Sequence, residues 1–348
     1  MPVICLILLL YSGLARSEKP SFDFSRYHNF KEYENYLEAV ANKLPTLVKL
    51  QVIGYTHEGR RLLALKIGNP VQANSKRIVY IDGGNHAREW PAFHTATFFI
   101  HKLITGYGKD PEITSYVDKL NFYILPVLNP DGFEFSFSAR TALLRNWRKN
   151  RTPKNCVNDL LLGKESCCQG VDINRNYDFG FDQTVYSLKN PCSDEYQGPF
   201  PFSEPESRAI RDFFTSDELR NKTDVVISLH THGQMIILPY NHRRSSYPKD
   251  YADLMAVALK AKMALKKYSG REYQIGTMAD IFRPAPGSAT DWIKNQTTTK
   301  YVFVFELPPD TTTWFAFQIK PNTLLSTATE TWQGVKVVID QVIDENNL

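Results

Sequence analysis

Strand-like and helix-like patterns alternate along this chain, and the alternation limits the possible folds more than any other property of the sequence. Apolar, β-rich runs occur at about 48–55, 61–68, 77–83, 120–128, 225–230, 236–240, 273–278 and 301–307. Helical patterns fall near 29–43, 91–106, 203–215, 250–268 and 325–343. This order is typical of an α/β protein in which helices cover both faces of a sheet. We therefore predict a mixed, twisted, mostly eight-stranded sheet.

A single domain is the expected organisation. Thr56-His57-Glu58-Gly59 separates the first two strands and is a hairpin signal. No internal repeat, low-complexity tract or linker divides the 348 residues, and α/β enzymes of this length often form one domain. The segment 150–200, rich in Cys, Asn, Gly and Pro, is predicted to be one long excursion from the sheet.

Composition and charge exclude several classes of protein. Hydrophobic residues make up 43% and charged residues 22% of the chain, which is ordinary for a globular protein and excludes intrinsic disorder and fibres. Lys and Arg number 41 against 37 Asp and Glu, and no run of five or six basic residues occurs. Nucleic acid is therefore not an expected partner.

The first seventeen residues differ in kind from the rest. Residues 3–11 form an apolar run, and Ser12-Gly13 and Ala15-Arg16-Ser17 follow it. A short apolar core followed by small residues predicts a signal peptide, residues 1–17, cleaved after Ser17. The alternative is a buried N-terminal strand, and the lack of Lys or Arg before the run weakens the signal. A bilayer span needs about 20 apolar residues, so we expect a secreted mature protein without a membrane partner.

The cysteines agree with export. Cys5 lies in the predicted signal peptide, and Cys156, Cys167, Cys168 and Cys192 lie within 37 residues of one another. An even, clustered set in an exported chain predicts disulfides, with three pairings open. A structural zinc site is the alternative, although adjacent cysteines are poor ligand spacing. Three N-x-S/T sequons, compatible with a glycoprotein, begin at Asn150, Asn221 and Asn295.

Several candidate catalytic side chains follow predicted strands. His86 and Glu89 come after one strand, and His230 ends another. Ligands gather outside the carboxyl ends of strands in open α/β sheets, so these side chains could meet. Two His and one Glu with an open fourth position form a catalytic zinc set. Glu306 ends a strongly apolar strand, where an acid is costly unless it is paired or functional. For each residue alone, a capping or surface role remains the simpler interpretation.

Further motifs lie around these residues in a fixed order. They are Asn85-His86-Ala87-Arg88-Glu89-Trp90, Asn129-Pro130-Asp131-Gly132-Phe133, Trp147-Arg148-Lys149, Asp172-Ile173-Asn174-Arg175-Asn176 and, after His230, Phe303-Val304-Phe305-Glu306-Leu307. In this combination the chain closely resembles the secreted zinc metallocarboxypeptidases of the pancreatic carboxypeptidase A/B family. The resemblance runs from about residue 24 to the C-terminus. Several spaced motifs in one order are far more specific than any single motif.

The resemblance implies a role for each matching residue. His86, Glu89 and His230 would hold one Zn²⁺ per chain, which would act as a Lewis acid and lower the pKa of a bound water. Glu306 would take the proton of that water as general base. Arg148 would stabilise the negative oxygen of the tetrahedral intermediate.

The same resemblance implies how substrate is held. Asn174 and Arg175 would bind the free C-terminal carboxylate, since a guanidinium is a planar two-point donor. Arg88 and Arg145 match subsite arginines that contact the substrate chain further upstream. The implied activity is hydrolysis of the last peptide bond of peptides and proteins by a monomer, and protein inhibitors are a further class of expected partner.

The most consequential departure from the family is Arg283. In an ungapped register it stands where the family has a mobile tyrosine that closes over the substrate and donates a hydrogen bond to it. Arg283 could supply a second cation to a carboxylate, or it could point into solvent and leave the lid function absent. A catalytically weak homologue that binds peptide C-termini is therefore the alternative function.

The specificity pocket also departs from the best-known relatives. Thr290 stands where an Asp selects Lys or Arg and an aliphatic residue selects apolar side chains. The neighbouring matched positions are Ile237, Asn241, Met278, Ala285 and Val304. Burying a cation there without a carboxylate is costly, so we expect an apolar or aromatic C-terminal residue, with an acidic one drawn by Arg283 as second choice. His232 shares a strand face with His230, and we expect it to line a subsite rather than bind metal.

Two further expectations rest on the resemblance. Cys168 and Cys192 match a usual disulfide of the family, which leaves Cys156 to pair with Cys167 and close an inserted loop. Relatives usually carry a pro-segment of about ninety residues, whereas here residues 18–348 are expected to be catalytic domain alone. Either the enzyme lacks zymogen control or the sequence is an incomplete gene product.

Overall fold

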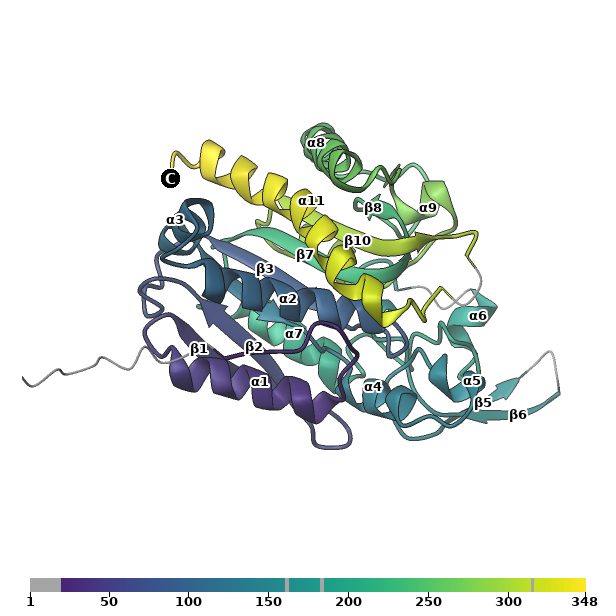
Figure 1. Ribbon diagram of the computed structural model, residues 1–348. Helices are drawn as coiled ribbons and strands as arrows, with labels where there is room; N and C mark the ends of the chain where they lie inside the picture. Colours follow the sequence, from purple (N-terminus) through teal and green to yellow (C-terminus); the bar gives the residue numbers. More distant parts are fainter. Residues whose placement is uncertain (1–19, 160–162, 182–184, 314–315) are drawn as a thin grey trace, which may run out of the picture.

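The computed structural model describes residues 20–159, 163–181, 185–313 and 316–348, so the predicted signal peptide, residues 1–17, lies outside the described residues. Eight strands form one mixed sheet in the order β1-β2-β4-β3-β7-β10-β8-β9 (Figure 1). These strands are β1 Val48–Tyr55, β2 Arg61–Ile67, β3 Ile78–Gly83, β4 Asn121–Leu125, β7 Thr223–Gly233, β8 Met235–Ile237, β9 Gln274–Gly276 and β10 Tyr301–Asp310. The predicted single α/β domain with an eight-stranded mixed sheet is confirmed.

The middle of the sheet is parallel. β3 runs parallel to both β4 and β7, and β10 runs parallel to β7. The outer pairs β1–β2, β2–β4 and β8–β10 are antiparallel, while β9 is parallel to β8. Because the carboxyl ends of parallel strands share one edge, whatever follows β3, β7 and β10 collects there.

Helices cover both faces of this sheet (Figure 1). One face packs against the four longest helices, which are α1 Phe30–Lys43, α2 Trp90–Gly106, α8 Tyr251–Ser269 and α11 Leu324–Glu345. The other face packs against two shorter ones, α7 Pro205–Thr215 and α10 Ala289–Gln296. Such double coverage explains why the central strands are mostly apolar on both faces rather than alternating with polar residues.

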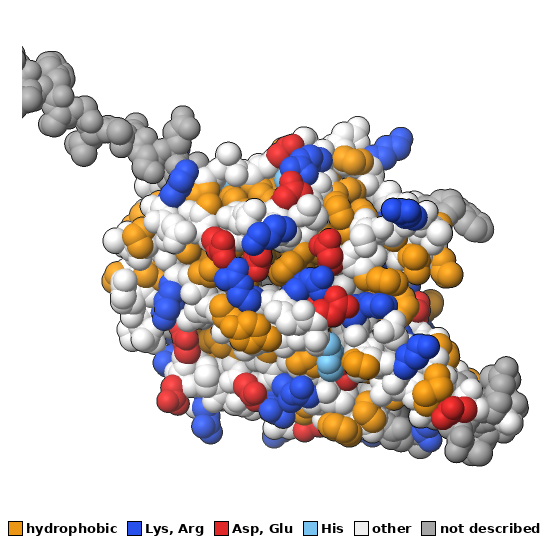
Figure 2. All heavy atoms as spheres, turned by 90° about the horizontal axis from the view of Figure 1, so that it is seen from below, with side chains coloured by type: hydrophobic (Ala, Val, Ile, Leu, Met, Phe, Trp, Pro, Cys, Tyr) orange, Lys and Arg blue, Asp and Glu red, His pale blue; other side chains and the backbone are white. Residues whose placement is uncertain are grey.

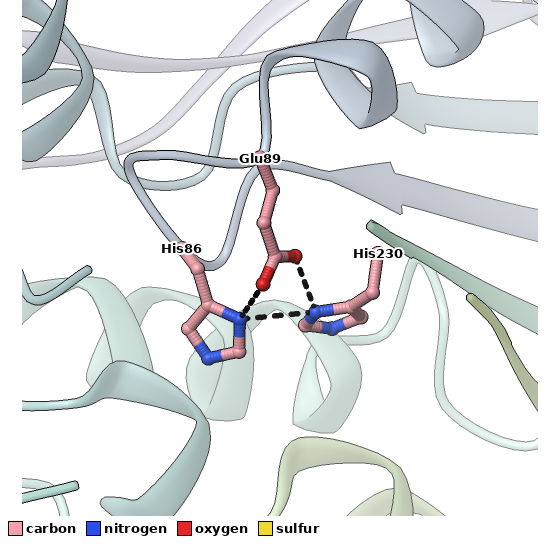
Figure 3. Close-up of side chains that lie close together, drawn as sticks. All are labelled: His86, Glu89 and His230. Carbon is pink, nitrogen blue, oxygen red and sulfur yellow. Dashed lines mark hydrogen bonds and ion pairs between the residues drawn. The ribbon is translucent and has the colours of Figure 1, made fainter. Parts of the chain in front are cut away.

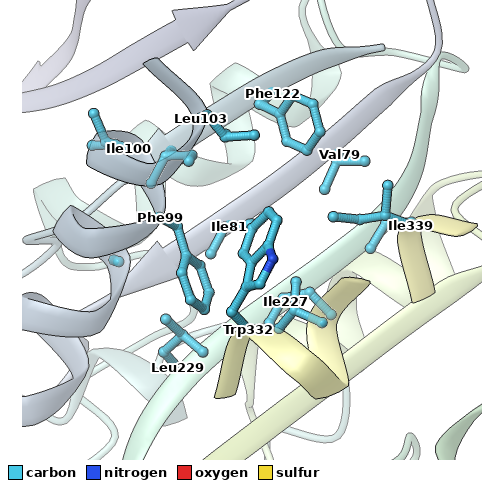
Figure 4. Packing of buried hydrophobic residues seen from close by; sticks show 14 of the residues in the cluster. Val79, Ile81, Phe99, Ile100, Leu103, Phe122, Ile227, Leu229, Trp332 and Ile339 are labelled. Carbon is cyan, nitrogen blue, oxygen red and sulfur yellow. The ribbon is translucent and has the colours of Figure 1, made fainter. Parts of the chain in front are cut away.

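Residues alternate between the two cores along each central strand. Val79 and Ile81 of β3 face the larger core, whereas Ile78 and Tyr80 face the smaller one. Trp332 of α11 is among the largest side chains of the larger core and is 1% exposed. Its ring packs edge-on against Phe99 of α2 at 5.2 Å, directly over the strands (Figure 4). This packing joins the last helix to the centre of the molecule.

Shorter elements fill the connections. They are α3 Pro111–Lys119, α4 Pro130–Phe137, α5 Ala142–Arg145, α6 Tyr186–Lys189, α9 Met278–Ile281, the 3-10 turns Ile173–Arg175 and Pro321–Thr323, and a two-stranded hairpin of β5 Asn155–Asp159 and β6 Lys164–Cys168. The hairpin lies within the predicted excursion 150–200 and projects from the body of the molecule (Figure 1).

Two disulfides hold this excursion. Cys156 pairs with Cys167 across the hairpin, and Cys168 pairs with Cys192. This is the pairing that the family resemblance implies. Since all four cysteines are bonded, they do not form the alternative structural zinc site.

The surface carries both signs of charge. On the face shown in Figure 2, basic and acidic side chains are interspersed, without a large area of one sign. None of the described helices is long and apolar enough to cross a membrane. Of the sequon asparagines, Asn150 is fully buried and its amide donates to Glu204 and Glu206, so in the folded protein it is not available to a glycan.

Candidate metal site and active-site pocket

The sheet brings the predicted metal ligands together. His86 and Glu89 lie in the loop between β3 and α2, and His230 lies on the neighbouring strand β7. Gly84 starts the loop with φ +75°, and a Cβ there would lie 2.2 Å from the ring of Phe93. The tight turn that directs the loop back over the sheet edge therefore requires glycine.

Three side chains converge on one point (Figure 3). His86 Nδ1 lies 2.7 Å from one carboxylate oxygen of Glu89, His230 Nδ1 lies 2.9 Å from the other, and the two ring nitrogens lie 3.1 Å apart. Ligands at about 2.1 Å from a tetrahedral zinc ion stand about 3.4 Å from one another, so side chains this close can share one zinc ion. The three side chains are 4%, 3% and 1% exposed for His86, Glu89 and His230. A cation is what such a buried set of nitrogen and oxygen donors requires.

The surroundings favour the ligand forms of His86 and Glu89, whereas for His230 burial opposes protonation but Glu89 outweighs it and raises the pKa. Burial and the nearby charge of Arg148 lower the pKa of His86, which keeps its imidazole neutral. Burial opposes ionisation of Glu89, but the two histidines outweigh it and hold its pKa well below the usual value. A neutral imidazole and an ionised carboxylate are the forms that bind zinc.

Asp172 supports both the metal site and Arg148. Its Oδ1 lies 3.2 Å from His86 Nε2, and its Oδ2 accepts from Arg148 Nε at 2.9 Å. A carboxylate on the far nitrogen of a histidine fixes which nitrogen faces the metal. The sequence placed Asp172 inside a motif but did not predict this role, because the contact joins segments 86 residues apart.

Glu306 stands beside the metal ligands. It lies on β10 directly opposite His230 on β7 in the strand register, and it lines the same pocket. Removal from water raises its pKa to about 8, while the charge of His230 opposes the shift. The two positive charges of a bound zinc ion would lower that pKa and so favour the ionised form that can accept a proton.

Arg175 lies at the other side of the pocket. Asn174 accepts from the backbone N–H of Ala289 through its Oδ1 at 2.9 Å, which fixes the orientation of its amide. Arg175 Nη1 donates to the backbone carbonyl of Asn174 at 2.9 Å, and Arg175 Nη2 lies 3.1 Å from Glu195 Oε1. Arg283 also lines the pocket, and its Nη1 pairs with Glu195 Oε2. The sequence did not single out Glu195.

The pocket is also lined by uncharged side chains. They are Ile237, Met278, Ala285, Val304, Asn241, Ser288 and Thr290. The amide of Asn241 is engaged, because it donates to Asp291 and accepts from the backbone N–H of Met278. Thr290 is 3% exposed, and its hydroxyl has no hydrogen-bond partner among the described residues. Among the described residues, the acids that line the pocket are Glu89, Glu195 and Glu306.

Not every predicted substrate residue reaches the pocket. Arg88 and His232 line an adjacent hollow together with Phe317, and the His232 ring packs edge-on against Phe317 at 4.9 Å. Arg145 instead stacks on Trp90 at 3.3 Å and donates to the backbone carbonyls of Arg88 and Phe317. Arg145 is not among the residues that line the pocket or the hollow, and its role in a substrate subsite stays a prediction.

A buried His-Glu-His set at the edge of a parallel sheet, with a free carboxylate beside it, defines an α/β metallohydrolase. Comparison with known proteins gives a more specific class. Residues 33–334 match the family model described as zinc carboxypeptidase.

Individual relatives agree over nearly the whole chain. Mouse carboxypeptidase A2 is 35% identical over 94% of this chain and 73% of its own length. Carboxypeptidase B of the crayfish Astacus astacus is 35% identical over 92% of this chain and 99% of its own. The solved structure of bovine thrombin-activatable fibrinolysis inhibitor, in complex with tick carboxypeptidase inhibitor, has a TM-score of 0.79 at 28% identity and covers 92% of this chain and 99% of that one.

The chain therefore belongs to the zinc carboxypeptidase family, as the resemblance of its motifs implies. Its activity is that of a metallocarboxypeptidase, a hydrolase of peptide bonds. The metal that its family implies fits the donor set of His86, Glu89 and His230.

Proposed function

We propose that this protein is a secreted zinc exopeptidase that hydrolyses the last peptide bond of peptides and proteins, with Glu306 as general base. The observation that carries the proposal is the register of β10 on β7, which puts Glu306 directly opposite His230. Zinc, when bound by His86, Glu89 and His230, supplies a Lewis acid and lowers the pKa of a water. Glu306 accepts a proton from the attacking water and returns it to the leaving amine.

Arg148 is the proposed donor to the oxygen that becomes negative. Two of its nitrogens, Nε and Nη2, contact Asp172 at 2.9 and 2.8 Å, so its position is fixed before substrate arrives. A preorganised donor of this kind stabilises a transition state by about 3–4 kcal/mol. Because Asp172 also contacts His86, the oxyanion donor and the metal site share one support.

Asn174 and Arg175 are the proposed anchor for the C-terminal carboxylate. Both line the pocket that contains Glu306, and Arg175 is 8% exposed. A guanidinium with little water around it binds a carboxylate more strongly than an exposed one does. Such an anchor restricts cleavage to the last residue. Arg88 and His232 line the hollow where the upstream part of a substrate would lie.

We propose a preference for neutral apolar or aromatic C-terminal residues. Ile237, Met278 and Val304 supply apolar surface to the pocket, and its described lining contains no carboxylate beyond Glu89, Glu195 and Glu306 to pair with Lys or Arg. An acidic C-terminal residue is the alternative, because Arg283 stands at the pocket. A weak homologue that binds C-termini without efficient turnover is the second candidate function, and Arg283 in place of the family tyrosine is the observation that favours it.

Export, partners and stoichiometry follow from the same proposal. The predicted signal peptide and two disulfides are typical of secreted proteins. We expect one zinc ion per chain and a monomer. Protein inhibitors that occupy the pocket are expected partners, since a bovine relative was solved with a tick carboxypeptidase inhibitor.

Hydrolysis of blocked dipeptides ending in Phe, Leu, Lys, Arg, Glu and Asn tests this proposal. We expect the highest kcat/KM for Phe or Leu. A preference for Lys or Arg would contradict the pocket assignment, and a preference for Glu would establish the acidic alternative. No turnover of any member by protein with zinc bound would make the protein a binder of C-termini.

A further inference from the structure

One carboxylate joins two arginines at the entrance of the pocket. Glu195 Oε1 lies 3.1 Å from Arg175 Nη2, and Glu195 Oε2 pairs with Arg283 Nη1. The two guanidinium groups therefore contact the same carboxylate, one at each oxygen. Arg175 is the proposed anchor for substrate, and Arg283 is the departure from the family tyrosine.

Glu195 belongs to a firmly held segment. Cys192 is bonded to Cys168, and the carbonyl of Tyr196 accepts from the backbone N–H of Asp172 at 2.8 Å. The side chain of Glu195 is 13% exposed, whereas that of Arg283 is 54% exposed. Glu195 is thus the fixed partner, and it determines where the exposed arginine lies.

Arg175, Arg283 and Glu195 together leave one positive charge to attract an anionic ligand. Burial opposes ionisation of Glu195, but Arg175 and Arg283 outweigh it and lower its pKa. Two guanidinium groups and one ionised carboxylate carry a net charge of +1. A guanidinium has five N–H donors. Arg283 contacts Glu195 through Nη1, so the other N–H groups of Arg283 can donate to a second carboxylate.

We propose that Glu195 is a positioning residue that holds Arg283 beside Arg175, so that both arginines clamp the α-carboxylate of the substrate. This inference rests on the proposed exopeptidase function and specifies how its substrate is held. The clamp serves the α-carboxylate rather than an acidic side chain. A side chain would pass beyond the clamp to the wall of Ile237, Met278 and Val304, where a charge is costly.

The test compares Glu195→Gln, Arg283→Gln and the double variant. We expect each single variant to raise KM about tenfold for peptides ending in Phe, Leu or Glu alike, because each loses a charge-assisted contact. We expect kcat to change less than about twofold and Glu195→Asp to restore part of the KM. The double variant should be no worse than either single variant, since both break one clamp.

A matched control separates the clamp from general charge effects. Glu272→Gln makes the same change at an exposed residue that pairs with Lys262 and Lys266, and it should leave KM unaltered. A lower KM in Glu195→Gln would mean that Glu195 competes with substrate. Additive effects, or an effect on Glu-ending peptides alone, would equally overturn the clamp.

A binding measurement keeps the clamp testable if wild-type protein turns over no peptide, which would defeat the proposed function alone. The probe is a blocked dipeptide ending in Phe, compared with its C-terminal amide. The free acid should bind wild-type protein more tightly than the amide, and Glu195→Gln should remove most of that difference. If Glu195→Gln has the Tm of wild type and still prefers the free acid over the amide to the same degree, the clamp is contradicted.

Discussion

At the scale of single residues, the sequence predicted the site residues that lie close to apolar strands and missed one that does not. His86 and Glu89 follow an apolar strand, His230 and Glu306 lie in the carboxyl-terminal halves of two others, and the parallel middle of the sheet brings these parts together. Glu195 could not be predicted in this way. It lies in an irregular segment, and its two partners come from distant parts of the chain.

Thr290 allows the pocket assignment to be tested by one substitution. Its buried hydroxyl lacks a partner among the described residues, and the acids in the described pocket lining are Glu89, Glu195 and Glu306. Thr290→Asp should shift the preference from Phe and Leu toward Arg and Lys, because a carboxylate there offsets the cost of burying a cation. The ratio of kcat/KM for Arg-ending over Phe-ending peptides should rise about tenfold or more. An unchanged ratio would mean that the C-terminal side chain does not reach Thr290.

At the scale of elements, long periodic segments were predicted well and short ones were missed. The five predicted helices and eight predicted sheet strands all occur, and the helix bounds agree within two residues. Helices α3, α4 and α10, with nine, eight and eight residues, were missed because so few turns give little periodicity. Their start signals were present, since Asp110 and Asn129 each cap a helix and precede a proline.

The two disulfides should differ in their effect on catalysis. By the chain-entropy model each closed loop, of 11 and 24 residues in sequence separation, stabilises the fold by about 3 kcal/mol. Only Cys168–Cys192 holds the segment that carries Glu195. Replacing both of its cysteines by Ser should therefore raise KM for peptides as well as lower Tm. The same change at Cys156 and Cys167 should lower Tm with KM preserved. A raised KM in this second variant, with KM preserved in the first, would show that the hairpin contributes to the pocket.

At the scale of the whole molecule, the pairing order of the strands was beyond sequence reasoning. Patterns predict that strands exist, but the order β1-β2-β4-β3-β7-β10-β8-β9 depends on contacts between distant segments. The mixed character of the sheet could still be inferred, because a hairpin signal separates the first two strands and helices separate the central ones. The signal peptide stays a prediction.

Stability should depend on pH through a buried acid far from the metal site. Glu206 is fully buried beside Glu204, and burial raises its pKa to about 7, with the charge of Glu204 adding to the shift. A raised pKa means that protonation stabilises the folded state, so this contribution is complete below about 4.5 and is lost as pH rises through about 7. His57, whose pKa is raised by its hydrogen bond to Glu204, acts in the same direction.

Glu206→Gln retains the shape of the protonated form without the titration. The variant should therefore be more stable than wild type at pH 8, by on the order of 1–3 kcal/mol, and should differ little from it at pH 4.5. Denaturant unfolding at both pH values provides the comparison. A variant that is less stable than wild type at pH 8 would show that the ionised Glu206 carboxylate stabilises the folded protein, which contradicts a raised pKa.

The central claim is that Glu306 is the general base beside a zinc ion held by His86, Glu89 and His230. The most direct measurement is zinc content together with kcat on a blocked dipeptide ending in Phe, for wild type and Glu306→Gln. We predict one zinc ion per chain in both proteins and a kcat that is about 10²- to 10⁴-fold lower in the variant. A variant that retains zinc and keeps kcat within a few-fold of wild type would contradict the account.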